Sequence, residues 1–515
     1  MLKRGLLLML CSALLCSLIG CGGTAPAETT IGGTQTEPTT IAPTEPEPTE
    51  EPWPDDGAYR AYYDDRISIT ELGGNADSVV EIVDQQVESF MIGSSDPDSA
   101  VVYYDKENAQ FIVIGTGVTT VSIDGTEKLI RARAASISLF MITGHSLGAG
   151  QCGNGAQSVM IEAGQAYSCH KTATFQEATA EMGIGFAAAT KPAGIDAFAP
   201  GGGGTIGEGS ALAWKWHQLT GEKVWVLNAA VGGSVIPEWH KGQTYYEPAV
   251  KMYRAAAQVL ANEVQAGHYV LKNTCVIYHS GANFDYKNVE FTDEIMEYWY
   301  DSMINGFRQD LAMDIDGDGT VETVDAIGFV PSGAGTLTND KPINYYLAAT
   351  DKYPNVYVVS KTVYDWRSDE LVQSNFPEIE YETQSESVEK PTLYSQLKAE
   401  DGVHLTQTGY NAAGLSIGEN LYKYFRTDFT LESFRFVDEN GNDVKDEIKM
   451  KRKGSSVKFT LLTEPCYVSD LTITLSDNLE MISPFVVKAT AEGEGFVTIS
   501  YKGEVLRHIV VKVGD

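Results

Sequence analysis

Basic residues are scarce in this 515-residue sequence. Lys and Arg number 37 against 70 Asp and Glu, so the formal net charge at pH 7 is -33. Proteins that bind a nucleic-acid backbone use Lys and Arg to neutralise its phosphates. The charge balance therefore excludes nucleic acid as an expected partner.

Cysteine is scarce too, with 7 residues in the chain. Beyond residue 21 they are Cys152, Cys169, Cys275 and Cys466, with no Cys-x-x-Cys pair and no Cys/His spacing of the kind that binds zinc. Cys152 and Cys169 are candidates for a pair, and the others look incidental. The sequence thus predicts no zinc site.

A short hydrophobic run opens the chain. A charged start, Met-Leu-Lys-Arg, precedes residues 5–19, which are apolar apart from Cys and Ser. This is a secretory signal, too short for a comfortable membrane span. Its end, Leu18-Ile19-Gly20-Cys21, resembles the bacterial lipobox, in which the cysteine receives lipid. We expect a signal peptide over 1–20, lipidation at Cys21 and a protein anchored at the extracellular face of the cell membrane. A signal cut elsewhere, with Cys21 an incidental thiol, is the alternative.

Residues 21–56 lack a pattern that would bury a core. From residue 22 to 56 there are eight acidic residues, no basic ones, and many Thr and Pro. Such a segment is typical of a disordered, self-repelling tether. It would carry a folded part away from the membrane.

An internal repeat links the two ends of the folded part. Residues 115–125 (GTGVTTVSIDG) align without gaps on residues 493–503 (GEGFVTISYKG). Both stretches alternate apolar and polar residues after a glycine, as strands of a β-sandwich do. Segments 57–136 and 427–515 resemble bacterial immunoglobulin-like domains, which implies a spacer or an adhesive role.

The middle of the chain, 137–426, alternates strand-like and helix-like runs. This order predicts an α/β domain with a parallel sheet and helices on both faces, in which ligands bind at the carboxyl ends of the strands. The expected strands are 137–143, 224–231, 274–279, 326–330 and 356–360, and the expected helices are 210–220, 247–265, 293–310 and a last one after Thr406.

Two stretches of this middle region carry residues suited to acyl transfer. Ser146 follows the first strand within the glycine-rich stretch GHSLG, where an exposed hydroxyl is able to attack a carbonyl. Asp401 stands three residues before His404, ahead of the last helix, so it is placed to orient an imidazole that takes the serine proton. A glycine-rich structural turn, or the elbow of an α/β-hydrolase lipase, would also fit the serine stretch.

Gly233 and Asn283 follow the next two strands, where a backbone N–H and a side-chain amide are suitable oxyanion donors. Serine, glycine, asparagine and Asp-x-x-His in this order resemble the four blocks of the SGNH hydrolase superfamily, over residues 137–425. The resemblance implies Ser146 as nucleophile, His404 as base and Asp401 as its partner, with an oxyanion hole of Ser146, Gly233 and Asn283.

The neighbouring sequence looks most like the carbohydrate and sialate O-acetylesterase branch of that superfamily. Departures are present, because this branch usually has Gly-Gln-Ser-Asn at the first block and Gln-Gly-Glu at the third. The resemblance implies a surface esterase that removes O-acetyl groups from carbohydrate without a cofactor in the chemistry. A non-catalytic carbohydrate-binding or adhesion lipoprotein and an α/β-hydrolase lipase are the alternatives.

Residues 314–325 (DIDGDGTVETVD) resemble a single calcium-binding loop. Carboxylates stand at positions one, three, five and twelve and glycine at six, a spacing of oxygen ligands that suits Ca²⁺. A solvated acidic turn is the alternative. The expected ligands of a structural Ca²⁺ are Asp314, Asp316, Asp318, Thr320 and Asp325.

Three aromatic residues after the second block have two possible roles. Trp239, Tyr245 and Tyr246 are suited to stack on sugar faces, or they belong to the core.

Overall fold

The computed structural model describes residues 52–87, 100–153, 158–159, 161–162, 164–170, 207–280, 292–331, 341–361, 404–426, 430–431, 433–438, 442–465, 471–483 and 486–514. The chain divides into two units, Met1–Pro54 and Asp55–Asp515. The expected signal peptide, Cys21 and most of the expected tether lie outside the described residues, as do Asn283 and Asp401. Among the helices that the structure describes, none combines the length and apolar character needed to span a membrane.

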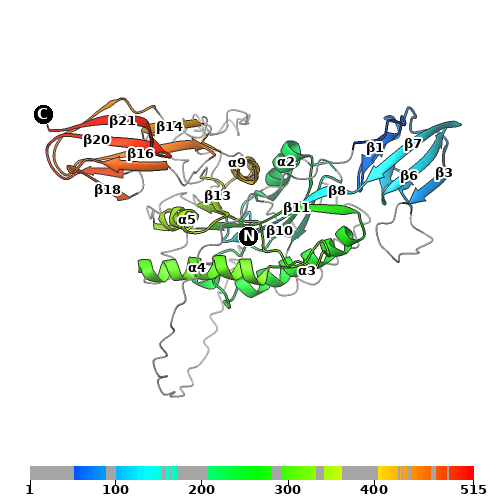
Figure 1. Cartoon of the computed structure of the whole chain (residues 1–515), viewed down its shortest axis with the longest axis horizontal. Helices are drawn as coiled ribbons and strands as arrows, with labels where there is room; N and C mark the ends of the chain where they lie inside the picture. The colour runs from blue at the N-terminus through cyan, green and yellow to red at the C-terminus, as the bar shows by residue number, and fades with distance from the viewer. Residues whose placement is uncertain are drawn as a thin grey trace, which may run out of the picture. The chain divides into compact units, whose positions relative to one another are not determined.

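A six-stranded sheet organises the middle of the chain (Figure 1). Its strand order is β13-β12-β11-β8-β10-β9, and every neighbouring pair is parallel. Its strands are β8 (Ala135–Gly144), β9 (Ala166–His170), β10 (Lys223–Asn228), β11 (Tyr269–Ser280), β12 (Ala326–Pro331) and β13 (Val356–Val358). A parallel sheet needs cover on both faces, which explains why β8 and β10 are almost continuously apolar.

Helices supply that cover on both faces. Leu139 and Met141 of β8 belong to a core cluster with α3, α4 and α5, whereas Phe140 and Ile142 belong to a second cluster with α2 and α9. Figure 1 shows α3 and α4 on the opposite side of the sheet from α2 and α9. The helices are α2 (Gly209–Thr220), η3 (Ile236–Glu238), α3 (Tyr246–Gln265), α4 (Asp293–Asp310), α5 (Lys341–Lys352) and α9 (Gln407–Phe425). The mixed α/β fold with a parallel sheet is confirmed, and β9 and α5 are elements that the sequence pattern missed.

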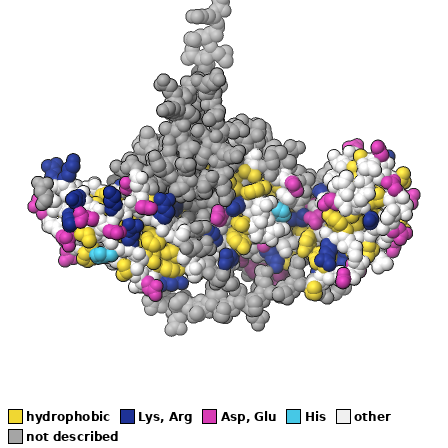
Figure 2. Space-filling view, turned by 90° about the horizontal axis from the view of Figure 1, so that it is seen from above, with side chains coloured by type: hydrophobic (Ala, Val, Ile, Leu, Met, Phe, Trp, Pro, Cys, Tyr) yellow, Lys and Arg dark blue, Asp and Glu magenta, His cyan; other side chains and the backbone are white. Residues whose placement is uncertain are grey.

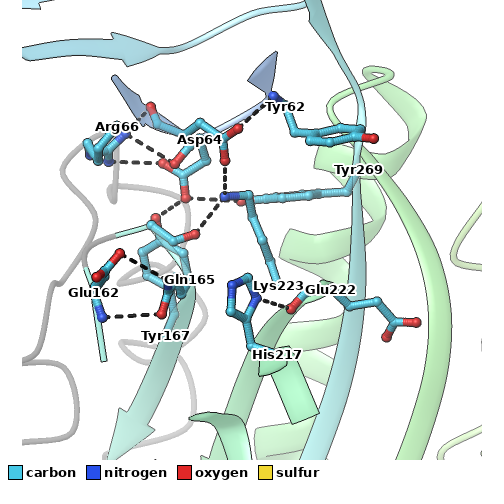
Figure 3. Close-up of polar contacts among 12 residues, drawn as sticks. Tyr62, Asp64, Arg66, Glu162, Gln165, Tyr167, His217, Glu222, Lys223 and Tyr269 are labelled. Atoms are coloured by element: carbon cyan, nitrogen blue, oxygen red, sulfur yellow. Dashed lines mark hydrogen bonds and ion pairs between the residues drawn. The ribbon is translucent and has the colours of Figure 1, made fainter. Parts of the chain in front are cut away.

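The amino ends of the sheet strands meet a polar segment of the preceding chain (Figure 3). Lys223, at the start of β10, donates from Nζ to Asp65 Oδ1 at 3.0 Å and to the Gly164 carbonyl at 2.7 Å. Asp64 is paired with Arg66 and accepts a hydrogen bond from Tyr167 Oη. Burial raises the pKa of Asp64. This polar network lies at the amino ends of the sheet strands, away from their carboxyl ends.

The segments before and after the parallel sheet are built from mainly antiparallel sheets. The first contains β1 (Tyr59–Tyr62), β2 (Arg66–Ser68), β3 (Val80–Val87), β4 (Val102–Asp105), β5 (Gln110–Val113), β6 (Gly117–Ile123) and β7 (Thr126–Arg133). The second contains β14 (Ser433–Asp438), β15 (Glu447–Met450), β16 (Ser456–Glu464), β17 (Leu471–Leu475), β18 (Leu479–Ser483), β19 (Val486–Ala489), β20 (Gly493–Tyr501) and β21 (Glu504–Val513). Each has its own apolar core. On the face shown in Figure 2, hydrophobic side chains lie in small groups among charged ones.

The sequence repeat occupies the same place in both segments. Its two copies contain β6 and β20, which pair antiparallel with the last strands, β7 and β21. The connecting turns are Asp124-Gly125 and Lys502-Gly503, with positive φ at all four residues, the backbone of a type I′ hairpin. The first sheet strand is parallel to the last in each, β1 to β7 and β15 to β21. The all-β character is confirmed, and the immunoglobulin-like assignment stays a prediction.

Candidate active site

Ser146 lies in a tight turn directly after β8. Ala149 N donates to His145 O and Gln151 N donates to Ser146 O, both at 3.0 Å, so the chain coils at once into a helical turn. The Ser146 residue is 7% exposed. The turn begins at Gly144, which has φ +111° and whose added Cβ would lie 2.2 Å from the His279 carbonyl oxygen. A glycine is required there because the backbones of β8 and β11 approach too closely for a side chain.

The side chain of His145 is buried inside this turn and hydrogen-bonds to its backbone. Its Nδ1 accepts a hydrogen bond from Leu147 N at 3.1 Å, and the residue is 1% exposed. Burial, and then the charges of His279 and His404, lower the pKa of His145 well below the ordinary value. His145 is therefore neutral, and with Nδ1 acting as acceptor its proton resides on Nε2. The influence of His404 also shows that the expected base lies near the nucleophile turn.

The helix that follows His404 is tied to the same turn. Thr406 caps α9 by accepting a hydrogen bond from Gly409 N at 3.2 Å. Tyr410 Oη donates to the Gln151 carbonyl at 2.7 Å. His404 and Ser146 are 258 positions apart in sequence. The hydrogen bond from Tyr410 to Gln151 thus joins the two segments that carry them. Asp401, the expected third member, lies outside the described residues.

The loop after β10 borders Ser146. Val231 N donates to the Gly144 carbonyl at 2.8 Å, and Asn228 Nδ2 donates to the Gly148 carbonyl at 3.0 Å. A Cβ added to Gly232 would lie 3.9 Å from Ser146 Cβ. Gly233, the next residue, is exposed with φ +75°. The structure thus places Gly232 beside the serine, and the oxyanion role of Gly233 stays a prediction.

The end of β11 reaches the same edge of the sheet. His279 pairs in register with Gly144, and Tyr346 Oη donates to the Ser280 carbonyl at 2.9 Å. Asn283 lies three residues beyond the described end of β11. β11, which leads to Asn283, therefore ends beside the nucleophile turn. The role of Asn283 itself stays a prediction.

Sequence reasoning missed three residues of this region: His145, Glu208 and His279. His279 Nδ1 lies 2.8 and 3.0 Å from the two carboxylate oxygens of Glu208, and both side chains are 0% exposed. The ring of His279 is centred 6.2 Å from that of His145. A histidine beside the motif serine was visible in the sequence, but nothing local linked Glu208 to His279.

The aromatic residues after the second block belong mainly to the core. Trp239 is 0% exposed and donates from Nε1 to Ser234 Oγ at 2.8 Å. Tyr246 is also 0% exposed and donates from Oη to Asp310. Tyr245 is half-buried and lies against Trp239. A sugar-stacking role is wrong for Trp239 and Tyr246, because neither ring faces solvent.

The acidic loop gathers three of its expected ligands. One oxygen from each of Asp314, Asp316 and Asp318 lies within 4.8 Å of the others. Asp325 is not part of this group, because its Oδ2 accepts hydrogen bonds from both the backbone N and Oγ1 of Thr274. Thr320 donates its N–H to Asp318 Oδ1 at 2.6 Å.

Glu322 is a further carboxylate whose pKa is affected by the charges of these three aspartates. Desolvation, and then the charge of Asp316, raise the pKa of Glu322, with smaller effects from Asp318 and Asp314. Its backbone pairs with Met313 across the loop. The fourth acidic side chain near the three aspartates is therefore Glu322, at position nine, and not Asp325.

Because His145 is buried in its neutral form, we expect the free energy of unfolding to depend on pH. Unfolded histidine takes up a proton near pH 6.5, whereas native His145 does so only at much lower pH. Below about pH 6.5 the unfolded state binds more protons, so the free energy of unfolding falls by up to about 1.4 kcal/mol per pH unit from this residue. His145→Asn keeps an acceptor for Leu147 N and does not titrate. Urea unfolding at pH 7.5, 6.5 and 5.5 should show a shallower fall for the variant, and equal slopes would contradict this assignment.

Comparisons with known proteins give distant structural likeness. No protein-family model matches the sequence, and no curated protein matches it. The chain is similar to a solved protein of Arabidopsis thaliana, at 16% identity over 57% of this chain and 99% of that one, with a TM-score of 0.34. It is also similar to a carbohydrate acetylesterase from Xanthomonas citri, at 13% identity over 88% of this chain and 97% of that one, again with a TM-score of 0.34.

Proposed function

We propose that the protein is a serine esterase that removes acyl groups, acetyl first, from carbohydrate. The observation that carries this proposal is the junction of the Ser146 turn with the helix that follows His404, at the carboxyl edge of a parallel sheet. A nucleophile at a strand end and a histidine near it are the two groups that acyl transfer needs.

The reaction begins with attack of Ser146 Oγ on the ester carbonyl while His404 takes the hydroxyl proton. The tetrahedral intermediate collapses as His404 returns that proton to the leaving sugar oxygen, which leaves an acyl group on Ser146. Water, deprotonated by His404, then releases the acid. Asp401 orients the imidazole, and the N–H groups of Ser146 and Gly233 with the amide of Asn283 stabilise the oxyanion.

The position of Ser146 supports this reading over that of a lipase elbow. β8 is the first strand along the chain among the described strands of the parallel sheet, and Ser146 follows it at once. An α/β-hydrolase places its nucleophile after several strands, whereas the SGNH order begins with it. The secretory start of the sequence and Cys21 further support a lipid-anchored protein at the extracellular face, where acylated polysaccharide is accessible.

Hydrolysis of p-nitrophenyl acetate, butyrate and octanoate by the full chain tests the proposal. Acetate is expected to give the highest kcat/KM. Activity on the long chain alone would favour a lipase. Absence of hydrolysis of every ester, with calcium present, would overturn the esterase function in favour of a surface carbohydrate-binding lipoprotein.

The loop around Asp314, Asp316 and Asp318 forms part of the same proposal as a structural Ca²⁺ site. Three hard oxygen donors within 4.8 Å fit that cation, which would neutralise their mutual repulsion and brace the turn between α4 and β12. Glu322 is a further carboxylate whose pKa is raised by desolvation and then by the charges of the three aspartates close to it. The chemistry at Ser146 requires no metal.

Calcium is expected to raise thermal stability. At 10 mM Ca²⁺ and a Kd of about 0.1 to 1 mM, typical of extracellular sites, binding adds about 1.4 to 2.7 kcal/mol to the free energy of unfolding. Asp316→Asn should remove this gain, whereas Asp325→Asn should keep it because Asp325 bonds Thr274. Differential scanning calorimetry with Ca²⁺, Mg²⁺ or EDTA measures the effect, and an equal Tm in all three solutions would identify a plain solvated turn.

A further inference from the structure

A fully buried carboxylate and imidazole lie behind the candidate nucleophile. Glu208 immediately precedes α2 and His279 stands near the carboxyl end of β11, and neither side chain is exposed. Burying ionisable groups is unfavourable unless they are paired. Here the carboxylate contacts Nδ1 with both oxygens, while His279 Nε2 is buried without a hydrogen-bond partner among the described residues.

His279 forms the floor beneath the Ser146 turn. Its carbonyl accepts a hydrogen bond from His145 N at 3.2 Å. The same carbonyl fills the space where a side chain on Gly144 would stand, and the His279 Cβ would lie 3.4 Å from a Cβ added to Gly148. Any displacement of His279 is therefore transmitted to the backbone on both sides of Ser146.

Glu208 and the residue before it lie between the nucleophile turn and α9. A Cβ added to Gly207 would lie 3.0 Å from Gly150 Cα, in the turn. On the other side, Gln407 Nε2 donates to the Gly207 carbonyl at 2.9 Å, and a Cβ added to Gly414 would lie 2.3 Å from the Glu208 carbonyl oxygen. The segment 207–208 thus contacts both the turn that carries Ser146 and the helix that follows His404.

The two sets of contacts meet at the contact between His279 Nδ1 and the Glu208 carboxylate. His279 contacts the backbone of the Ser146 turn, and Glu208 belongs to the segment that contacts both the turn and α9. The contact between His279 Nδ1 and the Glu208 carboxylate joins the two residues. We propose that Glu208 and His279 are positioning residues, which together fix the separation of Ser146 and His404 required for proton transfer. This inference rests on the proposed function. It assigns the pair a role in kcat, because a misplacement of about 1 Å is able to cost about a hundredfold in rate.

A matched pair at the opposite edge of the sheet serves as control. Glu263 and His268 have the same chemistry, with Nδ1 at 2.8 Å from the carboxylate, and lie just before the start of β11. Their side chains are 27% and 29% exposed, and they lie away from the turn. If a His–Glu contact served only to secure β11, breaking either pair would affect Tm and leave kcat alone.

The experiment compares Glu208→Gln and His279→Leu with Glu263→Gln in the full chain. The first two variants should lower kcat for p-nitrophenyl acetate by roughly 10- to 100-fold with KM within about twofold. The Glu263→Gln variant should keep kcat within about twofold. His279→Asn, which retains a donor near the position of Nδ1, should recover kcat to within about fivefold of wild type and also serves if the other variants do not fold. Unchanged kcat in folded Glu208→Gln would overturn the inference.

A second readout separates this inference from the esterase proposal. The rate of Ser146 modification by a fluorophosphonate reports an activated serine whatever ester the protein prefers. Slow modification of Glu208→Gln beside fast modification of wild type supports the positioning role even if no sugar or phenyl ester is hydrolysed. If wild type is neither modified nor active, both the esterase proposal and the positioning role are overturned.

Discussion

Substitution of Ser146 by alanine is expected to lower kcat/KM for p-nitrophenyl acetate by about a thousandfold or more. The substitution removes the attacking oxygen and leaves the turn intact, because the hydrogen bonds that shape it involve backbone atoms and the His145 ring. KM for any residual activity should change little. Steady-state kinetics with thermal denaturation measured on the same sample gives both quantities.

The control for this variant is Ser455→Ala. Ser455 lies in the turn between β15 and β16, where its hydroxyl accepts a hydrogen bond from Arg452 N. Its activity should equal that of wild type. Retention of most activity by Ser146→Ala would identify another nucleophile, and the proposed mechanism would then be wrong.

Gly144→Ala is expected to destabilise the α/β domain by about 3 to 5 kcal/mol. Two costs add at this position. A φ of +111° is unfavourable for any L-residue, and the new Cβ would meet the His279 carbonyl oxygen at 2.2 Å and its carbon at 2.7 Å. The sheet must open locally to admit the methyl group. Tm should fall by roughly 10 °C, and activity should fall with it because Ser146 follows two residues later.

Gly221→Ala isolates the first of these costs. Gly221 ends α2 with φ +74°, and an added Cβ would meet nothing within 4 Å. This variant should lose only about 1 kcal/mol. Equal losses in the two variants would show that the contact between β8 and β11 accommodates a side chain, contrary to the geometry described above.

The sequence predicted those elements of the sheet whose signal is local. β8 was predicted because a strand covered on both faces reads as one apolar run. β9 was missed because it is short, lies at the edge of the sheet and contains Ser168 and His170. α5 was missed because Pro342 near its start favours a loop in a sequence pattern, although proline is tolerated in the first turn of a helix.

The residues of the candidate site also fall into those that the sequence predicted and those that it did not. Ser146 and His404 stand in short motifs, so the sequence predicted them, and the structure joins the segments that carry them through Tyr410 and Gln151. The contact between Glu208 and His279 joins residues far apart in sequence and has no motif, so it emerges only when α2 and β11 are packed together. Asp325 fitted the spacing of a calcium loop, but it immediately precedes β12, where the register of the sheet delivers it to Thr274.

The parallel pairing of β1 with β7 has a mechanical consequence for the first all-β segment. In this segment the first strand, β1, runs beside the last, β7, in the same direction. A pulling force on the two ends of such a pair acts along the strands in opposite directions. All the hydrogen bonds between them are then loaded in shear and must break together, whereas a pair pulled apart from one end would unzip bond by bond. The first all-β segment should therefore stay folded under loads that open a hairpin.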